Sequence, residues 1–138
     1  MNRTKAREAA FLLIFEWGFQ NGSDPAEIYA NAQTARDLED DEYVKDVFFG
    51  VVAHREEIDA LIEKYSRGWK KERISAVSRA LMSLCIYEMM NRPDIPIRAS
   101  LNEAIELVKK YDDEAAKAFV NGILDAVSKE ARVARNEE

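Results

Sequence analysis

Hydrophobic residues recur along this chain with the period of an α-helix. Between residues 43 and 52 they are spaced so that they share one face of a helix: Tyr43, Val44, Val47, Phe48, Val51 and Val52. The pattern resumes at Ile58 after the polar residues 54–57, so we expect one long helix, or two with a bend, ending near residue 67. No segment sustains the two-residue alternation of a β-strand. The predicted fold class is therefore all-α.

Five further helices follow from the same periodicity and from their end signals. The first spans about residues 4–20, and the second starts at the cap Asp24 with Pro25 in its first turn and ends near residue 36. Ser75 caps a helix that runs to about residue 90, and two prolines make residues 91–96 a loop. The last two helices start at Ile97 and at residues 112–113. We expect six or seven helices in a single domain of residues 1–138.

Two helices carry features that their periodicity does not explain. The first has apolar residues around most of its circumference, so it lies either at the centre of the core or partly exposed against a partner, and the pattern alone favours the centre. The last contains Asn121-Gly122, a pair typical of hairpins, but the helical pattern continues through it. A glycine inside a helix costs about 1 kcal/mol relative to alanine. We therefore expect a second helix to approach closely at Gly122.

Charge is distributed unevenly along the chain. The formal net charge is −6, yet Arg3, Lys5 and Arg7 precede the first acidic residue, Glu8. Cations at the start of a helix oppose its dipole, so helix stability does not explain them. Contacts with phosphates would, because each neutralised phosphate releases a counterion. The alternative is a basic terminus without a specific role, which composition alone slightly favours.

The sequence contains none of the usual signs of catalysis or metal binding. Cys85 is the one cysteine and His54 the one histidine, so no internal disulfide can form and little remains for zinc. The acidic residues 37–42 lack the spacing of a calcium loop, and no Gly-rich phosphate loop or nucleophile motif occurs. No run approaches the ~18 apolar residues of a membrane span. We expect a cytoplasmic protein that is not an enzyme and carries no cofactor or metal.

Two longer stretches stand out as motifs, LNEAIEL at residues 101–107 and FVNGILD at residues 119–125. Shorter ones are Ala6-Arg7-Glu8, Trp17, Phe49-Gly50-Val51, Ile58-Asp59, Trp69 with Arg73, Tyr87-Glu88 and Asp94-Ile95-Pro96. Taken together and in this order, they resemble the NusB family of bacterial transcription antitermination factors. The resemblance covers nearly the whole chain, apart from about residues 22–42.

The resemblance implies a fold, a function and two sets of contacts. Family members have two helical subbundles and bind the boxA element of nascent ribosomal operon transcripts with the ribosomal protein NusE, within an RNA polymerase antitermination complex. Carried over to this chain, the single-stranded RNA would contact Arg3, Lys5, Arg7, Lys117, Phe119 and Asn121. NusE would contact Phe15, Ser78, Tyr87 and Glu88. Some members self-associate through the partner surface, which makes a homodimer an alternative.

The chain departs from the family pattern at several of these positions. Thr4 interrupts a basic arm that is denser in many members, and Ala118 stands where many have lysine. Phe15 and Ser78 replace polar or acidic groups that bond to NusE, and the helical spacing also places Phe119 on the core stripe. The departures at Thr4 and Ala118 predict weaker RNA binding or more reliance on NusE, whereas those at Phe15 and Ser78 argue against the corresponding bonds to NusE. A helical adaptor without specific RNA recognition is the alternative, and an RNA-modifying enzyme is disfavoured because no nucleotide-binding βαβ unit is present.

Overall fold

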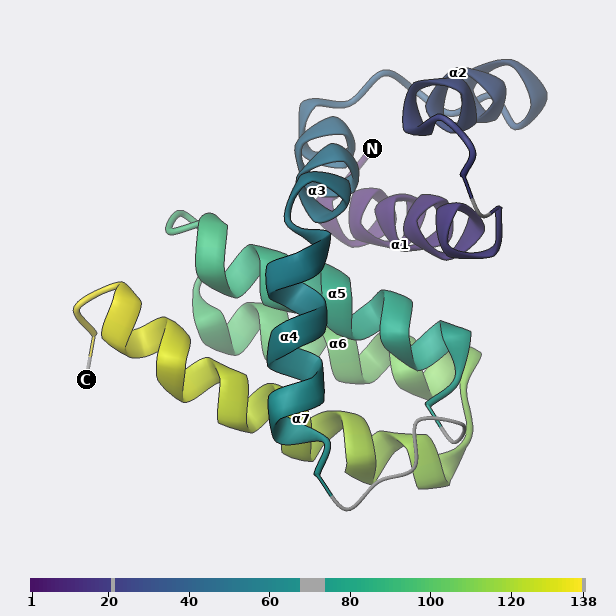
Figure 1. The fold of residues 1–138 in the computed structure, drawn as a ribbon. Helices are drawn as coiled ribbons and strands as arrows, with labels where there is room; N and C mark the ends of the chain where they lie inside the picture. Colours follow the sequence, from purple (N-terminus) through teal and green to yellow (C-terminus); the bar gives the residue numbers. More distant parts are fainter. Residues whose placement is uncertain (21, 68–73, 138) are drawn as a thin grey trace.

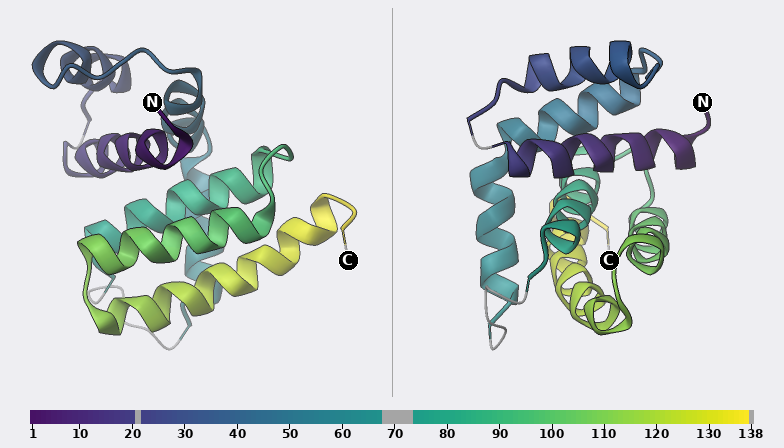
Figure 2. Two further views of the ribbon diagram at one scale, coloured as in Figure 1. Left: turned by 180° about the vertical axis from the view of Figure 1, so that it is seen from behind. Right: turned by 90° about the vertical axis from the view of Figure 1, so that its right-hand side faces the viewer.

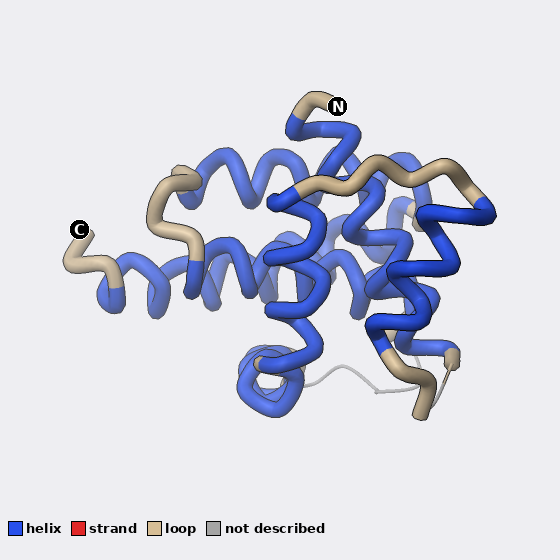
Figure 3. Tube along the Cα trace, turned by 90° about the horizontal axis from the view of Figure 1, so that it is seen from above, coloured by secondary structure: helices blue, strands red, loops and turns tan. Residues whose placement is uncertain are grey.

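Seven helices make up the part of the chain that the computed structural model describes, residues 1–20, 22–67 and 74–137 (Figure 1). They are α1 (Arg3–Phe19), α2 (Pro25–Ala35), α3 (Glu42–Ala53), α4 (Arg55–Tyr65), α5 (Ala76–Asn91), α6 (Ile97–Tyr111) and α7 (Glu114–Ala134). These residues include no strand, as Figure 3 shows, so the all-α prediction is confirmed. Trp69 and Arg73, which contribute to the family resemblance, lie outside the described residues.

The helices form two groups that share α5. In Figure 1, α1, α2 and α3 lie above, and α4 to α7 lie below. α1 and α3 pack against each other and against α5, while α6 and α7 pack against α5 from the other group. Both views of Figure 2 show the α5–α6 pair between α1 on one side and α7 on the other. This is the predicted arrangement of two helical subbundles.

Helix boundaries follow from polar side chains at their ends. The side chains of Asp24 and Ser75 accept hydrogen bonds from the main-chain N–H groups of the first turns of α2 and α5, as predicted. Asp41 does the same for α3, and Asn2 for α1. His54 lies between α3 and α4, so residues 43–65 form two helices with a bend, the second of the two expected alternatives.

The centre of the core is α5 rather than α1. Every residue from 80 to 89 is buried, because α1, α3, α4, α6 and α7 all contact this helix. α1 buries one face only, and Phe19 at its end is 66% exposed. The expectation of a central first helix is therefore wrong, because α2 and α3 cover α1 on one side and leave its C-terminal end open.

The glycine that permits a close helix contact is Gly50 in α3. A Cβ atom built on Gly50 would overlap the ring of Tyr87 in α5. A Cβ on Gly122 would meet no heavy atom within 4 Å, and Gly122 is exposed. The prediction of a close approach at Gly122 is therefore wrong, because the side of α7 that carries Gly122 faces away from the neighbouring helices.

Arg135 ties the end of α7 to the end of α5. Its guanidinium donates hydrogen bonds of 2.8–2.9 Å to the main-chain oxygens of Glu88, Met89, Arg92 and Ile95. The oxygens of Glu88 and Arg92 also accept main-chain hydrogen bonds from Arg92 and Ile95, so the Arg135 side chain adds a second donor to each of them. The loop between α5 and α6 is thereby held in one position.

Two glycine substitutions should act in opposite directions. Gly50→Ala should lower the free energy of unfolding by about 1–3 kcal/mol, because the added methyl group forces the Tyr87 ring to move. Gly122→Ala should raise it by up to about 1 kcal/mol, because alanine favours the helix and meets open space. Urea unfolding followed by circular dichroism measures both. Equal effects would contradict the close contact at Gly50.

Candidate nucleic-acid interface

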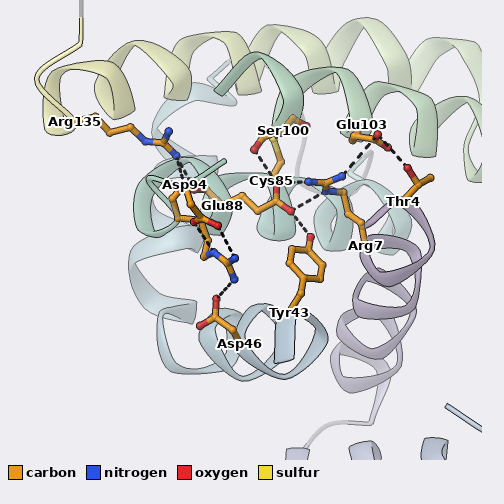
Figure 4. Close-up of polar contacts among 11 residues, drawn as sticks. Thr4, Arg7, Tyr43, Asp46, Cys85, Glu88, Asp94, Ser100, Glu103 and Arg135 are labelled. Atoms are coloured by element: carbon orange, nitrogen blue, oxygen red, sulfur yellow. Dashed lines mark hydrogen bonds and ion pairs between the residues drawn. The ribbon is translucent and has the colours of Figure 1, made fainter. Parts of the chain in front are cut away.

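One buried carboxylate organises the region around the start of α1. Glu88 of α5 accepts hydrogen bonds from the Arg7 guanidinium of α1, at 2.8 Å from Nε and 3.2 Å from Nη2. It also accepts from the Tyr43 hydroxyl of α3 and, at 2.7 Å, from Ser100 Oγ of α6. Figure 4 shows these side chains converging on Glu88 from three other helices. A single side chain therefore connects both helix groups.

The charges in this cluster compensate each other out of contact with water. Glu88 is 0% exposed and the Arg7 side chain 4%. Burial acts to lower the pKa of Arg7, but the hydrogen bond and charge of Glu88 outweigh it and raise that pKa. Burial, followed by the charge of Glu88, raises the pKa of the Tyr43 hydroxyl well above its usual range. Arg7 therefore stays charged and Tyr43 stays protonated, as a donor to Glu88.

The predicted basic arm is divided by this cluster. Arg7 points inward, and its nearest additional acid is Glu103 of α6 at 3.8 Å. Arg3 and Lys5 are exposed and form no ion pair within the described residues. Of the three predicted cations, Arg3 and Lys5 are thus accessible, whereas the guanidinium of Arg7 is bound by a buried carboxylate.

The second predicted group of RNA contacts lies elsewhere. Lys117 and Asn121 lie on α7, where Asn121 is exposed, while Phe119 is only 6% exposed and packs in the core, as its spacing suggested. α7 lies across the α5–α6 pair from α1 (Figure 2). Lys117, Phe119 and Asn121 thus lie on a different helix from Arg3 and Lys5, and the RNA contacts expected of them stay predictions.

Most predicted partner residues are also buried. Ser78 donates a 2.7 Å hydrogen bond to Asp112, and Tyr87 donates one of 2.9 Å to Asp46. Exposed fractions are 1% for Ser78, 6% for Tyr87 and 0% for Glu88. Each of these three side chains thus joins helices within the chain, and its contact with NusE stays a prediction. Phe15 alone of this group remains partly exposed.

Phe15 lines an apolar groove that the sequence did not reveal. Residues from the C-terminal half of α1, from α3 and α4, and from the start of α5 line it, including Ile14, Phe15, Trp17, Phe19, Ile58 and Ala80. The Phe15 and Phe19 rings meet edge to face at 4.9 Å between centroids. Phe19 lies four residues after Phe15, and this helical spacing is the signal that could have identified it.

A few exposed Lys and Arg side chains have no acidic partner in the described residues. Most exposed Lys and Arg side chains in the described ranges form ion pairs, such as Arg36 with Glu16 and Lys64 with Glu130. Those that form none within these ranges are Arg3, Lys5, Arg67 and Arg98. Arg98, in the first turn of α6, was not predicted. Pairing depends on distant segments, so no local pattern could have shown which cations stay available.

The described part of the chain offers neither a metal site nor a helix suited to a membrane. No group of three or more His, Cys, Asp or Glu side chains there is arranged to hold a metal ion. No helix in those residues combines the length and apolar character that crossing a membrane requires. Cys85 is fully buried, with its Sγ atom 3.5 Å from the main-chain oxygen of Ser100.

Comparisons with known proteins cover nearly the whole chain. Residues 4–129 match the model of the NusB family. The transcription antitermination protein NusB of Acetivibrio thermocellus is 46% identical over 131 residues, which cover 94% of this chain and 90% of that protein. NusB of T. maritima has a TM-score of 0.80 and 33% identity over 94% of this chain and 92% of its own. A chain in the crystal structure of antitermination factors NusB and NusE in complex with dsRNA has a TM-score of 0.80 and 32% identity, over 94% of this chain and 99% of its own.

The buried ion pair gives a direct stability prediction. Glu88→Gln should lower the free energy of unfolding by about 3–5 kcal/mol, because it leaves the Arg7 charge buried without a counter-charge. Glu106→Gln, which removes an acid paired with Lys109 on the surface of α6, is the control and should have a much smaller effect. Chemical denaturation measures both. Equal losses of stability would show that Glu88 does not hold a buried charge.

Proposed function

Because this chain belongs to the NusB family of transcription antitermination proteins, we propose that it binds the boxA element of nascent ribosomal operon RNA together with NusE and joins the antitermination complex of RNA polymerase. The observation that carries the RNA part is the pair of exposed cations, Arg3 and Lys5, that the fold leaves without acidic partners in the described residues. On an acidic chain that pairs most of its surface cations, these two remain free to neutralise phosphates.

The contacts we infer are those of single-stranded RNA. Arg3 and Lys5 would bind phosphates at the start of α1, and Lys117 with the exposed amide of Asn121 would form a second contact on α7. The two sets lie on different helices, α1 and α7, so the strand would have to reach both. Phe119 would support α7 from the core rather than stack on a base.

The apolar groove is the surface we propose for NusE. Phe19 is a large apolar side chain left 66% exposed at its edge, and aromatic anchors at the centre of an interface supply much of its binding energy. A chain of similar fold and 32% identity occurs in the crystal structure with NusE and dsRNA. The same groove supports the alternative of a protein–protein adaptor without specific RNA contact, which the withdrawal of Arg7 from the arm favours.

A salt titration tests the RNA contacts. The double variant Arg3→Ala/Lys5→Ala should bind single-stranded boxA RNA more weakly than the unaltered protein. The slope of log affinity against log salt concentration should become shallower by about 0.7 for each phosphate that the variant no longer neutralises. Fluorescence anisotropy of labelled RNA at several salt concentrations measures both quantities.

The control variant removes two cations that the fold does pair. Arg36 and Lys64 are both about half exposed and both ion-paired, so Arg36→Ala/Lys64→Ala lowers the net charge equally. It should leave the salt slope unchanged. If the two double variants lose affinity alike, binding reflects net charge, and Arg3 and Lys5 form no specific site. Equal affinity of the unaltered protein for boxA and a scrambled RNA, with tight NusE binding, would favour the adaptor.

The groove is tested by placing a charge at its edge. Phe19→Asp should weaken NusE binding at least about tenfold, because it removes an apolar anchor and buries a carboxylate in the interface. Val133→Asp is the control, since Val133 is 77% exposed on α7, away from the groove. Isothermal titration calorimetry with purified NusE measures both. Unchanged affinity in Phe19→Asp would exclude the groove as the NusE surface.

A further inference from the structure

The ring of Tyr43 lies against the exposed cation of the arm. Arg3 Cζ is 4.4 Å from the centroid of the Tyr43 ring, well inside the range of a cation–π interaction. Tyr43 is 6% exposed, whereas Arg3 is exposed. A largely buried aromatic ring thus supports a side chain whose charge reaches solvent.

Tyr43 is itself held firmly. Its hydroxyl donates to Glu88, which is fully buried and also binds Arg7 and Ser100. Because the hydroxyl is fixed at one end and the residue lies in the first turn of α3, the ring has little freedom to rotate away from Arg3. Figure 4 shows the Tyr43 hydroxyl directed at Glu88.

Arg3 differs from the other two cations near this ring. The Cζ atoms of Arg7 and Arg92 lie 5.7 and 5.6 Å from the centroid. Carboxylates bind both: Glu88 binds Arg7, and Asp94 and Asp46 bind Arg92 at 2.8 Å. All three cations lie near the Tyr43 ring. Within the described residues, Arg3 is the one of the three that forms no ion pair with a carboxylate.

Asp94 is the acid whose titration the Arg3 charge influences. The hydrogen bond from Arg92 is the main cause that lowers the pKa of Asp94 to about 2, and Arg3 contributes less. Both carboxylate oxygens of Asp94 already accept hydrogen bonds from Arg92, at 2.9 and 2.8 Å. Asp94 is therefore occupied by Arg92 and leaves the guanidinium of Arg3 available.

We propose that Tyr43 is a positioning residue that holds the Arg3 guanidinium ready for an RNA phosphate. A carboxylate in place of the ring would neutralise the charge of Arg3 and occupy its N–H donors. An aromatic ring attracts the cation but leaves its charge and its N–H donors available to a phosphate. Because the Arg3 side chain is already held in place before RNA binds, it loses less conformational entropy on binding. This proposal rests on the proposed RNA-binding function and assigns a residue that supports it.

A double-mutant cycle tests the coupling between the two residues. Tyr43→Leu should weaken RNA binding about two- to five-fold, the range expected for an exposed cation–π contact, and should have no effect when Arg3 is already alanine. Tyr43→Phe keeps the ring but loses its hydrogen bond to Glu88, so it should bind RNA more tightly than Tyr43→Leu. Lys5→Ala is the matched control, because the effects of Lys5→Ala and Tyr43→Leu should simply multiply. A Tyr43→Leu effect of equal size with and without Arg3 would overturn the proposal.

Nuclear magnetic resonance supplies a readout that does not require Tyr43→Leu to fold. The δ protons of Arg3 should be shifted upfield by the ring in the unaltered protein and in Tyr43→Phe, before any RNA is added. Shifts typical of a free arginine would overturn the proposal whatever the affinities show.

The cycle is run with boxA RNA and with a scrambled RNA, so that the two claims fail separately. If the two substitutions are coupled in binding to both RNAs, but the protein does not prefer boxA, the boxA function is wrong and the role of Tyr43 stands. If the protein prefers boxA but Tyr43 and Arg3 are not coupled, only the proposed role of Tyr43 is wrong. No binding to either RNA would overturn both.

Discussion

The buried ion pair between Arg7 and Glu88 is the interaction on which the rest of this structure depends. A carboxylate with no exposure must be compensated, and Glu88 obtains its donors from α1, α3 and α6 while belonging to α5. A buried pair contributes little net stability compared with an apolar core, but removal of one partner is strongly unfavourable. The four helices are therefore held in one relative position by the need to satisfy a single charged group.

That constraint also decides which charges the molecule presents. Because Glu88 takes up Arg7, the positive feature at the start of the chain is reduced to Arg3 and Lys5. Because the same carboxylate holds Tyr43, a rigid ring is available beside Arg3. The interior cluster and the exposed arm are thus parts of one arrangement, in which a buried acid orders the side chains that carry charge to the surface.

Periodicity and capping residues were sufficient to predict the helices, because both depend on neighbours in the sequence. Features that depend on contacts between distant segments could not be predicted in this way. Gly50 and Gly122 both lie in apolar helical stretches, and only the position of Tyr87 shows which of them needs to be glycine. The burial of Arg7 had a signal in hindsight: it lies three and seven residues before Ala10 and Ile14, on their face of the helix.

The central claim is that Arg3 meets the RNA while Arg7 stays bound to Glu88. The most direct measurement follows the side-chain Nε–H resonances of both arginines by NMR as boxA RNA is added. The account predicts that the Arg3 signal moves and returns at high salt, because phosphate contacts are screened. It predicts that the Arg7 signal, protected by burial and by Glu88, stays where it is. A shift of Arg7 with Arg3 unchanged would contradict the account.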